Sequence, residues 1–340
     1  MSRTYDVAVV GATGLVGEAM IDLLEARAFP VGRLFALASE RSRGREIKFR
    51  GETVIIEPLS EFDFEKAEIG LFSAGGSISA EYALRATEAG CIVIDNTSQF
   101  RYDDDVPLIV PEVNAERIGD YVKRGIIANP NCSTIQLVVA LKPIYDAVGI
   151  ERINIATYQA ISGAGRGALE QMIEDARQML SGLDPVTRGA EKSVAFNVVP
   201  HIDDFVDGGF TKEEMKIVWE TRKIFEDQNI MVNPTVARVP VYFGHSEAVH
   251  IETRTKVTAG EVQKLLNAAA GVVLLDGHET GAYPTAATDA DGNDAVFVGR
   301  VREDPSHPRG IDLWVVSDNV RKGAALNSIQ IAEILVNQLM

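Results

Sequence analysis

The residue with the clearest chemical potential is Cys132, within residues 128–136, which read ANPNCSTIQ. An apolar segment precedes this stretch, and residues 137–141 follow it with the pattern of a helix, so Cys132 is predicted at a helix start. Unpaired N–H groups and the positive end of the dipole at a helix N-terminus stabilise a thiolate. Cys132 is therefore a candidate nucleophile, although a cysteine taken alone is more often a buried structural residue.

A second candidate for acid–base chemistry is His245. It follows Gly244, which lets the backbone come close and the imidazole project, and it has the most site-like neighbourhood of the five histidines. A cysteine and a histidine form the pairing that activates a thiol. The two residues are distant in sequence, so their proximity is a prediction for the fold.

Charged residues in the second half are candidate ligands for an anionic substrate. Arg238 is a lone cation in the apolar run 236–241 and needs a fixed anionic partner there. Thr211 and Glu214 have the spacing of a capping box, which puts Glu213 and Lys216 on one face of the following helix. The alternative for Glu213 and Lys216 is a solvated ion pair that contributes little.

The chain opens with a strand, a glycine turn and a helix. Residues 6–10 predict a buried parallel strand, residues 11–17 read GATGLVG, and residues 18–26 have helical spacing. Gly11 and Gly14 allow the backbone to approach a pyrophosphate at the helix N-terminus. The spacing is GxxGxxG rather than GxGxxG, but the strand–turn–helix context favours dinucleotide binding over a plain turn.

The end of the next strand, residues 34–38, indicates which dinucleotide is bound. It continues as SERSRG, in which Glu40 suits the ribose hydroxyls of NAD while Arg41 and Ser42 suit a 2′-phosphate. The sequence therefore favours NADP, and Arg43 is interpreted as a solvated loop residue. Ser73, at the end of a further strand, is one of several small residues of the kind that line a cofactor crevice.

Repeated βα units with short loops predict an α/β fold with a Rossmann-type doubly wound parallel sheet. Within this part, residues 107–114 are expected to be extended. After Cys132, strands and helices with other spacings predict an α+β catalytic and dimerisation domain, and the terminal helix, residues 325–339, is expected to return to the first domain. The predicted domains are 1–131 with 319–340 for NADP binding and 132–318 for catalysis and dimerisation.

Composition excludes several classes of function. The 340 residues suffice for about two domains. A net charge of −16 argues against a nucleic-acid partner. Two cysteines fit a reducing compartment, and no Cys/His spacing predicts zinc or another metal. We expect no signal peptide and no membrane span, because the chain leads straight into a strand and lacks a long apolar run, so a cytoplasmic location is expected.

Taken together, these stretches resemble the aspartate-β-semialdehyde dehydrogenase family along essentially the whole chain. The resemblance implies reversible NADPH-dependent reduction of 4-phospho-L-aspartate to L-aspartate 4-semialdehyde and phosphate, in lysine (diaminopimelate), methionine and threonine biosynthesis. It also implies a homodimer or a dimer of dimers. The matching stretches are GATGLVG at 11–17, FRYDDDVPLIVPEVN at 100–114, NPNCSTIQ at 129–136, YQAISGAG at 158–165, EEMKIVWETRKI at 213–224, RVPVYFGHSEAVHIE at 238–252 and SDNVRKGAALNSIQIAE at 317–333.

The resemblance also implies roles for individual residues. Cys132 matches the nucleophile that forms an acyl thioester, His245 the acid–base residue, and Gln159 the residue that orients the substrate. Those matching substrate ligands are Arg101 and Lys216 for phosphate, Arg238 for the carboxylate and Glu213 for the amino group. The residues expected at the cofactor are Gly11, Thr13, Gly14, Leu15, Val16, Arg41, Ser42, Ser73, Ser162, Gly163 and Asn319.

Two alternatives stay open at this level. N-acetyl-γ-glutamyl-phosphate reductases also combine a glycine-loop cofactor domain with Cys and His, but Glu213 with Lys216 and the FRYDD stretch favour a substrate with a free amino group. A non-catalytic NADP-binding protein is disfavoured because a nucleophile, a base and anion ligands are all present. For Arg101, which precedes YDDD, the alternative is a surface ion pair.

Overall fold

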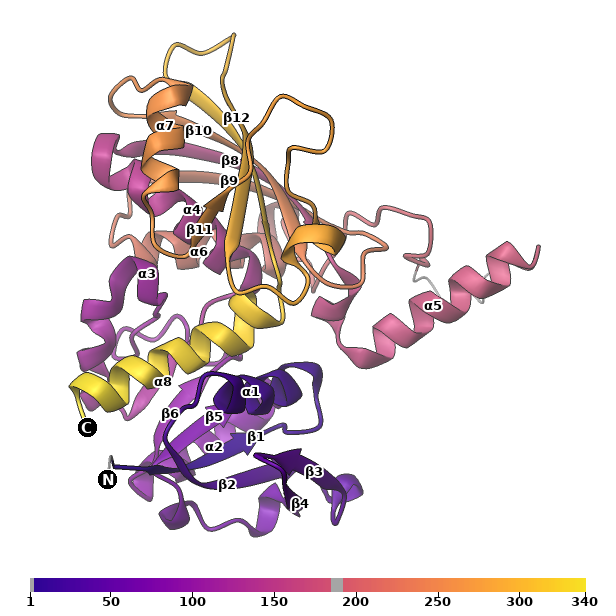
Figure 1. Ribbon diagram of the computed structural model, residues 1–340, viewed down its shortest axis with the longest axis vertical. Coiled ribbons are helices and arrows are strands. Elements are labelled where there is room, and N and C mark those ends of the chain that lie inside the picture. Colours follow the sequence, from indigo (N-terminus) through magenta and orange to yellow (C-terminus); the bar gives the residue numbers. More distant parts are fainter. Residues whose placement is uncertain (1–2, 185–191) are drawn as a thin grey trace. The chain divides into compact units, whose positions relative to one another are not determined.

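The computed structural model describes residues 3–184 and 192–340, which form two compact units (Figure 1). The first unit comprises Met1–Asn131 and Ala324–Met340, and the second comprises Cys132–Gly323. The sequence predicted the second boundary between residues 318 and 319, whereas in the structure it lies after Gly323. Asn319 stays with the second unit because its Oδ1 accepts the backbone N–H of Gly244 at 2.9 Å.

The first unit contains a seven-stranded sheet in the order β3-β4-β2-β1-β5-β6-β7. Its pairs are parallel except for β3 with β4, which confirms the Rossmann-type prediction and adds an antiparallel edge that the sequence reading missed. The strands are β1 (Tyr5–Val10), β2 (Val31–Ala38), β3 (Glu46–Phe49), β4 (Glu52–Pro58), β5 (Ile69–Phe72), β6 (Ile92–Asp95) and β7 (Ile126–Ala128).

Helices from both ends of the chain cover this sheet, since the C-terminal helix α8 packs on α1 and on β6. Apolar residues of α8, including Ile329 and Leu335, lie in the same core as Met20 of α1. The helices are α1 (Leu15–Ala26), α2 (Gly76–Glu88), α3 (Pro111–Asn114) and α8 (Leu326–Gln338). The expectation of extended chain over 107–114 is wrong for its second half, because Pro111 occupies the first turn of α3, where its fixed φ suits a helix.

The second unit contains a six-stranded mixed sheet in the order β11-β12-β13-β10-β8-β9. Helix α4 packs against β8, β10, β12 and β13, and its residues from Ser133 to Leu141 are buried. The elements are α4 (Cys132–Val148), β8 (Ile150–Gln159), α5 (Arg166–Leu180), α6 (Lys212–Ile224), β9 (Met231–Arg238), β10 (His245–Thr253), α7 (Ala259–Asn267), β11 (Val272–Leu274), β12 (Val296–Glu303) and β13 (Gly310–Ser317). Over the ranges that the structure describes, no helix is both long and apolar enough to cross a membrane.

Candidate active site

Three predicted site residues of the second unit lie at the ends of neighbouring strands. Gln159 ends β8 and Arg238 ends β9, and the two are direct partners in the parallel β8–β9 pair. His245 begins β10, which runs antiparallel to β8 on its other side. The three residues therefore lie together at one end of three neighbouring strands. Their positions, far apart in the sequence, do not show this proximity.

Helix α4 begins at Cys132 and places its sulfur next to His245. The Sγ lies 3.1 Å from Nε2 of His245, which is fully buried. The cysteine itself is partly exposed, unlike Cys91, whose burial raises the pKa of its thiol to about 12. Of the two thiols, only Cys132 therefore combines access with an acid–base partner and a helix N-terminus.

The hydrogen bonds of His245 determine where its proton resides. The backbone N–H of Ala160 donates to Nδ1 at 3.0 Å, so the neutral ring carries its proton on Nε2 and directs it at Sγ. Burial lowers the pKa of His245 well below its ordinary value, and the positive charge of Arg238 acts in the same direction. A neutral Nε2–H donor stabilises a thiolate, which is the donor half of the acid–base role predicted for His245.

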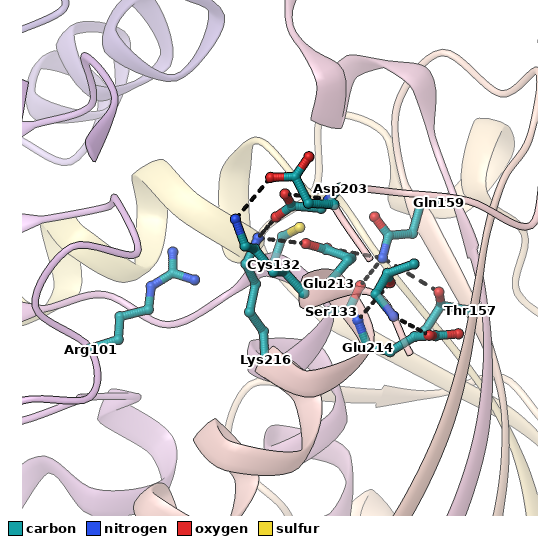
Figure 2. A network of polar contacts seen from close by, with 12 residues as sticks. Arg101, Cys132, Ser133, Thr157, Gln159, Asp203, Glu213, Glu214 and Lys216 are labelled. Atoms are coloured by element: carbon teal, nitrogen blue, oxygen red, sulfur yellow. Dashed lines mark hydrogen bonds and ion pairs between the residues drawn. The ribbon is translucent and has the colours of Figure 1, made fainter. Parts of the chain in front are cut away.

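Gln159 is buried and belongs to a network of polar side chains (Figure 2). Its Nε2 donates to Ser133 Oγ at 3.1 Å and to Glu213 Oε1 at 3.1 Å. Ser133 follows Cys132 on α4, and Glu213 lies in the first turn of α6. The amide therefore links the end of β8 to the two helices that carry the predicted nucleophile and the predicted ligand for an amino group.

Lys216 lies between two carboxylates, as Figure 2 shows. Its Nζ is 2.9 Å from Glu213 Oε2 and 2.7 Å from Asp203 Oδ2. Burial acts to lower the pKa of Lys216, but the two carboxylates outweigh burial and raise it, so the ammonium stays charged. The pair with Glu213 is not a solvated one, since both side chains are largely buried.

The start of α6 positions Glu213 and Lys216. Thr211 Oγ1 accepts the N–H of Glu214 at 3.3 Å, and Glu214 Oε2 accepts the N–H of Thr211 at 2.8 Å. These reciprocal bonds are the capping box that the sequence predicted. The helix begins at a defined residue, and this fixes the first turn from which both side chains reach the site.

Arg238 is buried at the same edge of the sheet, and its Nη1 donates to the carbonyl of Ala160 at 2.7 Å. Burial lowers the pKa of its guanidinium, while negative charge at Cys132 and Glu213 acts in the opposite direction. Ala160 thus holds His245 through its N–H and Arg238 through its carbonyl.

Arg101 belongs to the first unit, where it is buried. Its Nε donates to the carbonyl of Asn129 at 2.9 Å and its Nη2 to that of Asn96 at 2.7 Å. In the acidic run that follows, Asp103 and Asp105 pair with Arg124. Because Arg101 is buried, it does not form the surface ion pair of the alternative, and its role as a phosphate ligand stays a prediction.

A cavity of about 400 Å³ lies in the first unit at the carboxyl ends of β1, β2 and β5. Helix α1 begins beside it, and its N-cap is Gly14, which has no side chain that could accept the first N–H groups of the helix. A Cβ on Gly17 would lie 2.2 Å from the carbonyl oxygen of Gly11, so only glycine permits this packing. These features fit a dinucleotide pyrophosphate. The cavity is lined by Gly11, Thr13, Gly14, Ala38, Ser39, Glu40, Leu59, Ser60, Ser73, Ala74, Ile78 and Tyr82.

Other predicted cofactor residues of the first unit border this cavity in sequence. Leu15 and Val16 form the first turn of α1, and Arg41 and Ser42 lie in a short 3₁₀ turn directly after Glu40. The interpretation of Arg43 as a solvated residue is incomplete, because it pairs with Glu40 and with Glu61. A hydrogen bond from Arg43 lowers the pKa of Glu40, so the acidic side chain beside the cavity already has a cation.

The remaining predicted cofactor residues lie in the second unit, close to the Cys132–His245 pair. Asn319 donates through Nδ2 to Ser162 Oγ at 3.0 Å, which closes a small buried network. Gly163 follows Ser162 and adjoins the imidazole of His245. The structure therefore groups Ser162, Gly163 and Asn319 with the nucleophile, and their contact with a cofactor stays a prediction.

Comparison with known proteins gives the same family for both units. Residues 6–121 match the family model described as semialdehyde dehydrogenase, NAD binding domain, and residues 141–322 match semialdehyde dehydrogenase, dimerisation domain. An aspartate-semialdehyde dehydrogenase of Shewanella violacea is 57% identical over 99% of both chains, and one of Legionella pneumophila is 55% identical over 100% of this chain and 98% of its own. The chain belongs to the aspartate-semialdehyde dehydrogenase family.

Solved structures of this family have the same fold. A crystal structure of aspartate semialdehyde dehydrogenase II from Vibrio cholerae complexed with ASA has a TM-score of 0.97 and 55% identity, with full coverage of both chains. The family is one of oxidoreductases of amino-acid biosynthesis, and its first domain binds a nicotinamide cofactor.

Three residues that adjoin the site of this aspartate-semialdehyde dehydrogenase family member were not predicted from its sequence. Ala160 acts through its backbone, and Asp203 pairs with Lys216 from a loop. A Cβ on Gly323 would lie 2.9 Å from the Cβ of Cys132, so a side chain there would press on the nucleophile. Ala160 and Gly323 carry no functional group, so residue type alone gives no signal for them.

Proposed function

We propose that this chain catalyses the reversible, NADP-dependent reductive dephosphorylation of 4-phospho-L-aspartate to L-aspartate 4-semialdehyde through an acyl thioester on Cys132. The observation that carries this proposal is the 3.1 Å contact between Cys132 Sγ and His245 Nε2 at the start of helix α4. This contact supplies a nucleophile with its own proton donor, which a non-catalytic nucleotide-binding protein does not need.

Acyl transfer begins when the Cys132 thiolate attacks the acyl carbon of the substrate. The C–S bond forms, the bond from that carbon to the phosphate oxygen breaks, and phosphate leaves. Backbone N–H groups in the first turn of α4 and the Nε2–H of His245 are the donors available to the developing oxyanion. Gln159, held by Ser133 and Glu213, is placed to orient the acyl group.

Substrate recognition follows from the charges at the strand and helix ends. Arg238 can pair with the α-carboxylate through its planar guanidinium, and Glu213 with the free ammonium group. Lys216 supplies a cation for the phosphoryl group, and we propose that Arg101 supplies a second. The need for a free ammonium partner supports aspartyl phosphate over an N-acetylated acyl phosphate.

NADP would be held by the glycine turn and the start of α1, with Arg41 and Ser42 at the 2′-phosphate. When bound, the reduced dinucleotide supplies the hydride that converts the thioester to the aldehyde oxidation level. Ser162, Gly163 and Asn319 are proposed to line the nicotinamide end beside Cys132. Arg43 supports the preference for NADP because it neutralises Glu40, which would otherwise repel a phosphate.

The assembly and the compartment also belong to this proposal. The match to a dimerisation domain supports a homodimer. We propose that the chain forms a homodimer or a dimer of dimers. A cytoplasmic location is proposed because a nucleophilic cysteine must stay reduced.

The test is phosphate-dependent formation of NADPH from aspartate semialdehyde by the purified chain. We expect Cys132→Ala to abolish this activity and Cys91→Ala, a substitution of the buried second cysteine, to leave a folded enzyme with substantial activity. Undiminished turnover by Cys132→Ala would refute the thioester mechanism. Faster turnover of the N-acetylated acyl phosphate than of aspartyl phosphate would refute the proposed substrate.

A further inference from the structure

Glu247 is a fully buried carboxyl group that has no role in the mechanism above. It lies two residues after His245 on β10, so the two side chains point to the same face of the sheet. Neither carboxyl oxygen has a hydrogen-bond partner among the residues that the structure describes. A buried polar group in this condition is costly, so its retention needs a reason.

The amide of Gln136 is the side chain that acts on this carboxyl, and it acts to lower the pKa of Glu247. Gln136 lies on α4, four residues after Cys132, and therefore one turn further along the same helix face. Its Nε2 points to the backbone carbonyl of His245 at 3.4 Å. Helix α4 and strand β10 thus face each other through two successive pairs of side chains, Cys132 with His245 and Gln136 with Glu247.

The pair of Gln136 and Glu247 lacks one hydrogen-bond donor. With Nε2 of Gln136 directed at the carbonyl of His245, its Oε1 is left as an acceptor without a partner in the described part of the chain. A carboxylate has only acceptors to offer, whereas a protonated carboxyl offers one O–H. Burial outweighs the opposing effect of Gln136 and raises the pKa of Glu247 well above its ordinary value, which supports the protonated form.

We propose that Glu247 is a neutral carboxylic acid that donates its O–H to Gln136 Oε1 and thereby positions His245 against Cys132. The bond fixes the orientation of the Gln136 amide, the amide holds the His245 backbone, and the His245 ring keeps its Nε2–H on the sulfur. Glu247 is a positioning residue for the acyl transfer, since it touches neither substrate nor cofactor.

Neutrality of Glu247 also protects the thiolate. The titratable neighbour of Glu247 on β10 is His245, and Cys132 lies one turn before Gln136 on α4. The partners of Glu247 in register, Thr157 of β8 and Val315 of β13, carry no charge. A negative charge behind Cys132 would disfavour a thiolate there, as like charges do. A carboxylic acid gives the donor without the charge.

This inference rests on the proposed function, so its test includes a readout that needs no substrate. We would measure the rate of Cys132 alkylation by iodoacetamide at pH 7, together with kcat and KM for aspartate semialdehyde. Glu247→Leu removes the donor at similar volume, and we expect both kcat and the alkylation rate to fall about tenfold or more with KM within about twofold. Glu247→Gln keeps a donor without a charge, and we expect both rates within about threefold of the unsubstituted enzyme.

Two further variants keep the proposal testable if Glu247→Leu does not fold. Gln136→Met removes the acceptor and should lower alkylation as Glu247→Leu does. Val249→Ala, a buried change on the same strand, should lower thermal stability without slowing alkylation. Normal alkylation in Gln136→Met or Glu247→Leu, or an equal loss in Glu247→Gln, would overturn the inference. Intact alkylation with no turnover in the unsubstituted chain would instead refute the proposed function alone.

Discussion

A Cβ built on Gly163 would lie 2.8 Å from Nη1 of Arg238 and 3.3 Å from Cε1 of His245. Gly163→Ala should therefore displace the guanidinium, and we expect kcat/KM to fall about tenfold or more at nearly unchanged thermal stability. Steady-state kinetics and a thermal melt check this. Gly167→Ala is the matched control, because nothing lies within 4 Å of its added Cβ, and its kinetics should be normal. A neutral Gly163→Ala would contradict the tight approach.

Arg238→Lys should weaken substrate binding although the positive charge is retained. A lysine cannot form a planar fork with a carboxylate while also reaching the carbonyl of Ala160. A charge-assisted hydrogen bond contributes about 1.5–3 kcal/mol, so we expect KM for aspartate semialdehyde to rise about 10- to 100-fold. Initial-rate kinetics measure this, and an unchanged KM would show that Arg238 does not bind the carboxylate.

The preference for NADP over NAD should depend more on Arg41 than on the neighbouring cation Arg43. Arg41→Ala is expected to raise KM for NADP by about tenfold while leaving KM for NAD nearly unchanged, because only NADP carries the 2′-phosphate. Arg43→Ala should also raise KM for NADP more than KM for NAD, but by less than Arg41→Ala does, since Arg43 acts on the phosphate through its pair with Glu40. Equal losses with NAD and NADP in Arg41→Ala would remove this residue from the phosphate site.

Thr211→Ala and Thr258→Ala remove equivalent capping boxes from α6 and α7. Each should lower the free energy of unfolding by about 0.5–2 kcal/mol, measured in urea. Only Thr211→Ala should also raise KM, because α6 carries Glu213 and Lys216 in its first turns, whereas α7 carries no residue of the site. Equal kinetics for the two variants would indicate that the cap contributes to stability alone.

Glu247 should make stability depend on pH. Its pKa is raised in the native state, so above the ordinary glutamate pKa of 4.5 the native chain retains a proton that the unfolded chain has released. The free energy of unfolding should then fall as pH rises, and Glu247→Gln should remove this part of the slope. Urea unfolding at pH 6, 7 and 8 compares the two proteins. Parallel slopes would mean that Glu247 is not protonated in the native state.

Local patterns predicted the elements that carry most of the site. The glycine turn before α1, the start of α4 at Cys132 and the capping box of α6 all depend on residues close in sequence. The hairpin of β3 and β4 was not predicted. Arg50 and Gly51 both have positive φ in its two-residue turn, and of the two only Gly51 favours this conformation by its residue type.

The rest depends on contacts that sequence alone does not encode in residue type. Ala160 acts through its N–H and carbonyl, so any residue at that position would present the same groups. Asp203 resembles many surface aspartates until the fold places it on Lys216. The burial of Glu247 could not be predicted from its residue type either, because it results from the packing of α4 on β10.

The first unit is built from both ends of the chain, and this orders the events of its synthesis. When the ribosome has made residues 1–131, the apolar surface that α8 later covers is still open, because Ile329, Leu335 and their neighbours do not yet exist. The second unit is continuous from Cys132 to Gly323 and needs no later segment. We therefore expect the nascent chain to complete its second unit first and to close its first unit only once α8 has been made, with an exposed patch in the interval that a chaperone could bind.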